Sequence, residues 1–244
     1  MSRRFEPLVL CYHAVSDGWE HALSIGPAAF ERQLRLLLRA RWRPATVEQA
    51  AAGRGRLLHV TFDDAYTSVA RALPLLERLR VPATVFACSG YADEGRPLAV
   101  PELAADAAAQ PDELRTMAWD ELRELAERGV AVGSHTVSHP HLTAIDDGAL
   151  ARELRESRER LEDELRRPCP YLAYPYGEQD ARVRAAAEAA GYDAAFGLPG
   201  QEQPIDRFQL PRVGLYRRDG LARLAVKTTG VVRRPLARLT GRAA

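Results

Sequence analysis

Short apolar segments alternate with longer amphipathic segments along most of this chain. About seven of the short segments end at glycine, proline or polar residues, which is typical of buried strands. The longer segments repeat apolar residues at helical spacing, and they cover residues 27–40, 65–80, 119–128, 146–167 and 181–190. A regular alternation of strand and helix predicts an α/β fold, here a distorted parallel barrel of the (β/α)7 type.

Residues 91–110 break this alternation. They are rich in glycine, proline, alanine and acidic residues, and they show no clear periodicity. We expect an insertion over the face of the barrel that carries the chemistry, because loops placed on a rigid scaffold often shape substrate grooves.

Two adjacent carboxylates, Asp63 and Asp64, follow the apolar segment 57–62 directly. If this segment is a strand, both carboxylates lie at its C-terminal end, where α/β barrels carry their active sites. Taken alone, an Asp-Asp pair at this place is more often a solvated turn. Two histidines further along the chain favour a functional role for this pair.

His135 and His139 follow another short apolar segment, residues 130–133. Histidines four positions apart lie on one face of a helical turn and can present both rings to one metal ion, and Pro140 is expected to end that turn. One carboxylate and two imidazoles make a three-ligand site for a divalent ion with an open coordination position, as in catalytic metal sites. The other aspartate is then free to act as a base.

A third motif, Ala173-Tyr174-Pro175-Tyr176-Gly177, ends the apolar segment that begins at Tyr171. On its own it indicates a turn after a strand. With the three motifs in this order, the chain resembles the polysaccharide deacetylases of carbohydrate esterase family 4 over residues 8–216. The motifs are specific as a set.

This resemblance implies a role for each matching residue. Asp63 is expected to be the catalytic base. The metal ligands that it implies are Asp64, His135 and His139. The residues implied for the substrate groove are Pro175, Tyr176 and Gly177, with the Tyr176 backbone N–H directed at the oxyanion.

The chain departs from the family pattern in two places. The usual Arg-x-Pro-Tyr sequence reads Ala173-Tyr174-Pro175-Tyr176, so the arginine that orients the base is missing. The segment Leu210-Pro211-Arg212-Val213 looks like the one found in branches that have an Ala-Tyr-Pro-Tyr motif, which makes Arg212 the candidate to hold Asp63. The alternative is that Arg212 is one of many surface arginines.

The second departure concerns the general acid. The C-terminal Leu-x-His motif that supplies this acid in the family is absent, because no histidine follows His141. Residues 8–13 instead resemble the Tyr-His start of the poly-N-acetylglucosamine deacetylases, whose barrel is circularly permuted so that the strand with the acid opens the chain. This resemblance implies a permuted barrel here, with His13 as the general acid.

Length and composition limit the number of domains, the role of the cysteines and the location of the protein. A chain of 244 residues with 46% hydrophobic residues can form one domain with a sizeable core. The three cysteines are widely spaced in apolar settings, so neither a disulfide framework nor a zinc knuckle is expected. No convincing signal peptide and no apolar run of roughly 20 residues is apparent. We therefore expect a cytoplasmic protein.

Basic residues gather at the C-terminal end. Residues 212–244 hold nine basic residues and one acidic residue in a chain whose net charge is +1. We therefore divide the chain into a catalytic domain, residues 1–216, and a basic tail, residues 217–244. Residues 231–242 could rest on an anionic membrane surface, and the alternative is a solvated terminus. We see no nucleic-acid-binding module.

The predicted function is metal-dependent removal of N-acetyl groups from an amino sugar in a polysaccharide, oligosaccharide or lipid-linked glycan. Zinc is the expected ion, with cobalt or nickel as alternatives. Two other functions stay open. The same fold and metal triad serve hydrolases of small linear or cyclic amides. The two departures from the pattern also allow a carbohydrate-binding module that has lost catalysis.

Overall fold

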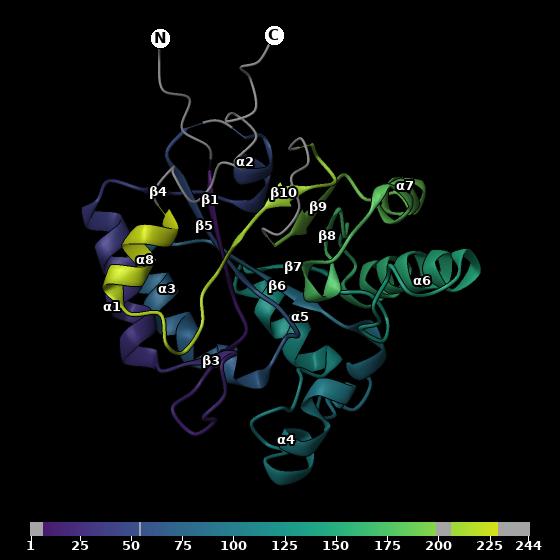
Figure 1. The fold of residues 1–244 in the computed structure, drawn as a ribbon, viewed down its shortest axis with the longest axis horizontal. Helices are drawn as coiled ribbons and strands as arrows, with labels where there is room; N and C mark the ends of the chain where they lie inside the picture. The colour runs from purple at the N-terminus through teal and green to yellow at the C-terminus, as the bar shows by residue number, and fades with distance from the viewer. Residues whose placement is uncertain (1–6, 54, 199–205, 229–244) are drawn as a thin grey trace, which may run out of the picture.

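Parallel strands form a nearly closed barrel with helices around it (Figure 1). The computed structural model describes residues 7–53, 55–198 and 206–228. The strands are β1 (Leu8–Tyr12), β2 (Ala14–Val15), β3 (Ser24–Ile25), β4 (Arg43–Pro44), β5 (Leu57–Phe62), β6 (Ala83–Ala87), β7 (Ala131–Ser134), β8 (Tyr171–Ala173), β9 (Ala194–Gly197), β10 (Leu210–Pro211) and β11 (Val213–Gly214). The helices are α1 (Pro27–Arg39), α2 (Val47–Ala51), α3 (Leu73–Leu79), α4 (Ala104–Ala109), α5 (Trp119–Glu127), α6 (Asp147–Leu165), α7 (Ala181–Ala189) and α8 (Leu221–Thr228), and the 3-10 turns are η1 (Thr67–Ala72), η2 (Ser89–Tyr91), η3 (Pro101–Leu103) and η4 (Pro175–Gly177).

The barrel closes at a single residue, Arg212. The strand order is β10-β9-β8-β7-β6-β5-β1-β11, so β10 and β11 lie at its two ends although only Arg212 separates them in the chain. β10 pairs with β9, β11 pairs with β1, and both pairings are parallel. If β10 and β11 count as one position, the barrel has seven, which confirms the predicted (β/α)7 type.

The first strand lies beside the last, as a permuted barrel requires. β1 pairs in parallel with β5 on one side and with β11 on the other. The end of β1 is therefore next to the end of β5, and His13 and Asp63 belong to neighbouring positions of the barrel. This arrangement brings the start of the chain to the site that the motifs predict.

Alternation along β5 separates a helix-facing side from a barrel-facing side. Leu58, Val60 and Phe62 belong to the large apolar cluster that the surrounding helices cover. His59 and Thr61 lie on the opposite face, because side chains alternate along a strand. The His59 Nδ1–H donates to the Ala45 carbonyl at 2.9 Å, and its Nε2 accepts from the Thr84 hydroxyl at 2.9 Å. The same alternation brings Asp63 to the barrel-facing side.

One predicted helix differs from the observed structure. Residues 65–80 do not form one helix, because Asp64 and Ala65 have φ angles of 67° and 52°, which are incompatible with a right-handed helix. The 3-10 turn η1 follows, and α3 begins only at Leu73, with a proline in its first turn. The other predicted helices are present, with ends that differ by one or two residues.

The insertion and part of the C-terminal segment are packed against the domain. Apolar residues of η2, η3 and α4 join Trp19 and Tyr66 in a second apolar cluster. Helix α8 lies beside α1 (Figure 1), and its Leu224 is fully buried. Residues 217–228 thus pack with the domain, whereas residues 231–242 lie outside the described residues. No helix in the described ranges is long and apolar enough to span a membrane.

Candidate active site

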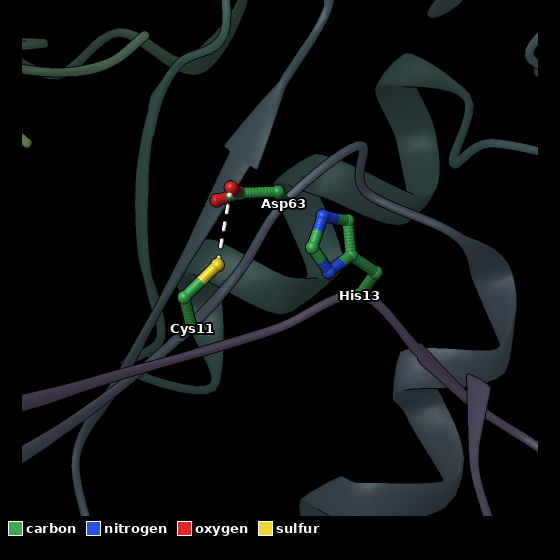
Figure 2. Close-up of side chains that lie close together, drawn as sticks. All are labelled: Cys11, His13 and Asp63. Carbon is green, nitrogen blue, oxygen red and sulfur yellow. Dashed lines mark hydrogen bonds between the residues drawn. The ribbon is translucent and has the colours of Figure 1, made fainter. Parts of the chain in front are cut away.

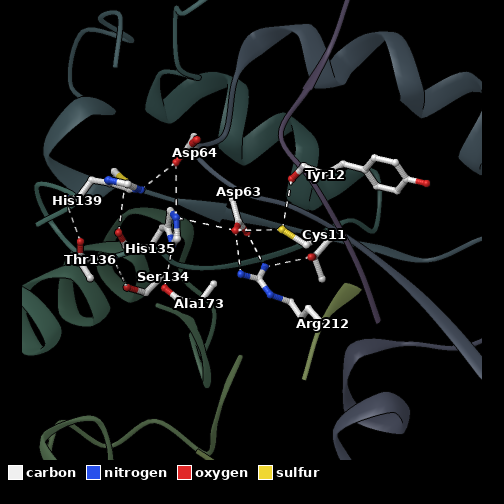
Figure 3. A network of polar contacts seen from close by, with 12 residues as sticks. Cys11, Tyr12, Asp63, Asp64, Ser134, His135, Thr136, His139, Ala173 and Arg212 are labelled. Atoms are coloured by element: carbon white, nitrogen blue, oxygen red, sulfur yellow. Dashed lines mark hydrogen bonds and ion pairs between the residues drawn. The ribbon is translucent and has the colours of Figure 1, made fainter. Parts of the chain in front are cut away.

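The paired carboxylates stand where β5 ends. The Asp63 backbone N–H still donates to the Tyr12 carbonyl of β1 at 2.9 Å, so Asp63 continues the strand ladder. The positive φ of Asp64 then turns the chain away from the barrel wall. Both side chains are buried, each residue being 2% exposed, yet they reach different partners (Figure 3). The turn therefore divides two adjacent carboxylates between two parts of one site.

Asp64 faces the two predicted histidines. Its Oδ1 lies 3.5 Å from His135 Nε2 and 3.4 Å from His139 Nε2. Nitrogen and oxygen ligands of a tetrahedral zinc ion are separated by about 3.3 to 3.6 Å, given bonds of about 2.0 to 2.2 Å. The same Oδ1 is buried and has no hydrogen-bond partner among the described residues. The three side chains, which form one ligand group, therefore fit a divalent cation.

The histidine rings are in the state that metal binding requires. The His135 Nδ1–H donates to the Ala173 carbonyl at 2.8 Å, so the lone pair of Nε2 is directed at Asp64. Burial lowers the pKa of His135 and of His139 to about 4. Both rings are thus neutral near pH 7, and a neutral imidazole is the form that binds a metal.

The histidine motif is a loop and not a helical turn, so that prediction is wrong. Thr136 and His139 have φ angles of 72° and 63°, which a right-handed helix excludes. The loop is held by side chains: the His139 N–H donates to Thr136 Oγ1 at 3.1 Å, and the Val137 and Ser138 N–H groups donate to Glu153 Oε2 at 2.8 and 2.9 Å. Its fold still brings the two rings to a centroid distance of 4.9 Å.

Glu153 is a site residue that the sequence did not indicate. It belongs to α6, whose exposed face carries many acidic residues, and nothing in the local pattern distinguishes it from them. Its carboxylate accepts hydrogen bonds from the backbone of the loop that carries both rings.

Arg212 lies against Asp63 in a buried bidentate ion pair (Figure 3). Its two terminal nitrogens are 2.6 Å from Oδ1 and 2.8 Å from Oδ2, and one of them also donates to Thr61 Oγ1 at 3.2 Å. Arg212 is completely buried, which rules out the surface arginine considered above. Arg212 stands between β10 and β11, where the barrel closes, and its side chain reaches Asp63 at the end of β5.

The two carboxylates differ in protonation chemistry. Burial alone would raise the pKa of Asp63, but the Arg212 guanidinium, together with His135 and His13, outweighs burial and holds that pKa well below its usual range. Burial raises the pKa of Asp64, and the nearby His13 and His135 only partly offset it. The ion pair therefore keeps Asp63 ionised, whereas Asp64 faces the two neutral imidazoles.

Cys11 and His13 approach Asp63 from β1 and the residues that follow it (Figure 2). The Cys11 thiol donates to Asp63 Oδ2 at 3.3 Å. Cys11 and His13 are two positions apart, which places both on the barrel-facing side. Sequence reasoning selected His13 and missed Cys11, although this spacing of two along a strand was available as a signal.

The Pro175, Tyr176 and Gly177 turn borders the metal group. Tyr176 has a φ of 58°, its ring lies edge-on to His139 at a centroid distance of 4.6 Å, and it stacks on His141 at 3.9 Å. A Cβ on Gly177 would lie 2.6 Å from Leu198, so only glycine fits this turn.

The insertion reaches the same turn. The Tyr176 hydroxyl donates to Glu102 Oε2 at 3.0 Å, and Glu102 belongs to η3. Residues 91–110 therefore border the active face, as the sequence analysis predicted. Glu102 itself was not predicted, because 74 residues separate it from Tyr176.

The sequence matches the polysaccharide deacetylase family over residues 50–195, and the chain belongs to this family. YxkH of Bacillus subtilis (strain 168) is 22% identical over 192 residues, which is 75% of this chain and 61% of YxkH. A chitooligosaccharide deacetylase of Rhizobium leguminosarum bv. trifolii is 29% identical over 147 residues, which is 58% of this chain and 56% of that protein. The chain thus covers less than two thirds of these two relatives.

A solved structure shows the same fold. A polysaccharide deacetylase from Bacillus cereus superposes with a TM-score of 0.74 at 23% identity, over 93% of this chain and 70% of that chain. The family resemblance noted from the motifs is thereby confirmed, and so is the fold that it implied.

Proposed function

We propose that the protein is a metal-dependent hydrolase that removes N-acetyl groups from an amino sugar in a polysaccharide, oligosaccharide or lipid-linked glycan. The observation that carries this proposal is the buried Asp63–Arg212 ion pair directly beside the Asp64, His135 and His139 group. Metal-assisted hydrolysis of an amide needs a base that is fixed in position, here by an ion pair, next to a three-ligand cation site. Membership of the polysaccharide deacetylase family supports the choice of an acetylated sugar.

Asp64, His135 and His139 would hold the divalent ion. Two imidazoles and one carboxylate suit zinc, and they also accept cobalt or nickel. When bound, such an ion supplies Lewis acidity and, in the case of zinc, lowers the pKa of water to about 7.

The remaining residues would divide the proton transfers between them. Asp63, oriented by Arg212, accepts a proton from the attacking water while the bond from the water oxygen to the acetyl carbon forms. The Tyr176 backbone N–H donates to the oxyanion that develops on the acetyl group. His13, in its protonated form, gives a proton to the sugar nitrogen as the C–N bond breaks. Acetate and a free amino sugar are the products.

Acetate release tests this function. The chain is loaded with zinc, cobalt or nickel and given a panel of N-acetylated glycans that includes lipid-linked ones. We expect acetate from at least one glycan, and none after chelation of the metal. Hydrolysis of a linear or cyclic amide without acetate from any glycan would replace the proposal by the amide alternative. Glycan binding without any hydrolysis would indicate a non-catalytic module.

We also propose a cytoplasmic location with peripheral membrane contact through residues 231–242. The three cysteines are free and buried, which supports a reducing compartment. Sedimentation with anionic liposomes compares the full chain with a chain that ends at Thr228. Equal sedimentation of the two chains would contradict the membrane contact, and recovery of the protein outside the cytoplasmic fraction would contradict the location.

A further inference from the structure

A second group of metal-binding side chains lies beside the first. Cys11 Sγ, a ring nitrogen of His13 and a carboxylate oxygen of Asp63 are all within 4.8 Å of one another (Figure 2). Cys11 and Asp63 already approach to 3.3 Å. Ligands of a tetrahedral zinc ion are about 3.3 to 3.8 Å apart when one of them is sulfur. Only a small movement of the His13 ring is therefore needed to complete the group.

The backbone fixes two of these ligands, and the third has a free nitrogen. Cys11 pairs with Thr61 in the register of β1 and β5, and Asp63 continues the same ladder. The Nδ1 atom of His13 is buried and has no hydrogen-bond partner among the described residues. A buried nitrogen without a partner, on a ring that also approaches a thiol and a carboxylate, is unusual in a folded protein, and a bound cation would give it a partner.

The three ligand types select the kind of ion. A thiolate together with an imidazole favours soft or borderline cations such as Zn²⁺ and Cd²⁺ over Mg²⁺ and Ca²⁺. Cys88 provides a contrast within the same site, because its thiol donates to the His135 carbonyl at 3.3 Å and it belongs to no ligand group in the described ranges. We therefore expect a thiophilic ion to bind at Cys11 and not at Cys88.

We propose that Cys11, His13 and Asp63 form a second, inhibitory site for a thiophilic divalent ion. On binding, the Cys11 thiol releases its proton to water and its sulfur donates an electron pair to the ion, while His13 and Asp63 donate one pair each. The Arg212 guanidinium already neutralises Asp63, so this site is weaker than the Asp64 group and fills second. The inhibition rests on the proposed function, because the ion occupies the residues assigned there as base and acid.

Counting bound ions tests the site without any substrate. Metal-free protein is titrated with Cd²⁺, and bound cadmium is measured by equilibrium dialysis together with the ultraviolet thiolate-to-cadmium charge-transfer band. We expect two ions for each chain, with the band growing as the second ion binds. Cys11→Ser keeps the size and the hydrogen bond to Asp63 but removes the soft ligand, so one ion and no band are expected. The matched control Cys88→Ser is expected to keep both ions and the band.

A further variant leaves Cys11 untouched. Asp64→Ala removes a ligand of the first site, and we expect it to keep one cadmium ion with the charge-transfer band. A parent chain that binds one ion only, or that shows no band, would overturn the second site, as would a second ion retained by Cys11→Ser. If both ions bind as expected but no glycan releases acetate, the site stands and the proposed function fails.

Discussion

Asp63 and Asp64 are neighbours in the chain and equally buried, yet their surroundings are opposite. Asp63 accepts two hydrogen bonds from Arg212, whose positive charge is the main cause that lowers its pKa, whereas Asp64 faces two neutral imidazoles and has a raised pKa because of its burial. A carboxylate that a guanidinium already neutralises binds a metal ion more weakly than one that faces neutral imidazoles. A bound cation stabilises a buried carboxylate of the second kind. The partners of each aspartate, and not the residue type, therefore determine its role.

The barrel supplies these partners from different places. We call the surroundings of Asp64 the metal side. They include the loop after β7, whose backbone N–H groups donate hydrogen bonds to Glu153 of α6. We call the surroundings of Asp63 the base side. They include Arg212, where β10 and β11 close the barrel, and Cys11 in the first strand. Because the two sides depend on separate elements, variants can damage one and spare the other.

The largest effect is expected on the metal side. Asp64→Ala, His135→Ala and His139→Ala each remove a ligand of the Asp64 group. Each variant is expected to lose that ion on dialysis, which also removes ions from the weaker Cys11, His13 and Asp63 site, and acetate release is expected to fall to background. Metal content after dialysis and acetate release are measured on the same samples. His141→Ala serves as the control for metal content, because this exposed histidine lies next to the loop without being a ligand. A ligand variant that kept full metal and full turnover would break the assignment.

His13→Ala tests the proposed general acid beside Asp63 without touching a ligand of the Asp64, His135 and His139 group. Loss of a general acid is expected to lower turnover on an N-acetyl substrate by roughly 10² to 10⁴ while the metal stays bound. An aryl acetate, whose leaving group needs no proton, is expected to recover most of this loss. Kinetics on the two substrates check the prediction, and equal losses on both would remove His13 from the mechanism.

Arg212→Met examines the ion pair itself. The substitution leaves the Asp63 carboxylate buried without its partner, which is expected to lower the free energy of unfolding by about 3 to 5 kcal/mol. Denaturant unfolding of the variant and the parent measures this difference. The double variant Asp63→Asn/Arg212→Met no longer buries a charge and is expected to recover part of the stability. Unchanged stability of the single variant would show that the pair contributes nothing to the fold.

The smallest effect concerns pH and a histidine that belongs to neither side. Burial lowers the pKa of His59 to about 4, so between about pH 6.5 and pH 4 the unfolded chain binds a proton that the folded chain does not. The free energy of unfolding of the metal-free protein is therefore expected to fall as the pH falls through this range, by up to about 3 kcal/mol from His59 alone. Unfolding curves of the parent and His59→Gln at several pH values test this. Equal slopes in both chains would contradict it.

Much of the fold could be predicted because it follows from local patterns. The apolar segments and their polar ends located the strand that precedes Asp63, and helical spacing located α1, α5, α6 and α7. The start of the helix predicted over residues 65–80 was wrong, because an active-site turn with positive φ overrides helical spacing there. Functional turns are where local propensity and tertiary structure most often disagree.

The site was predictable only in part, for a related reason. A spacing of four suits both a helical turn and the loop that the structure has, so the spacing of His135 and His139 indicated their partnership and not their backbone. Glu153 and Glu102 act through contacts with residues far along the chain, and no local pattern marks them. Arg212 was selected through the family resemblance, because hydrophobic periodicity does not indicate which of many arginines is buried.

The division of labour between the adjacent aspartates is the central claim, and metal analysis of two isosteric variants tests it most directly. Asp63→Asn and Asp64→Asn are purified side by side, given one equivalent of zinc and dialysed. We predict that Asp63→Asn retains the ion while its turnover falls by roughly 10² to 10⁴, and that Asp64→Asn loses the ion together with its activity. Loss of zinc from Asp63→Asn with retention by Asp64→Asn would contradict the account.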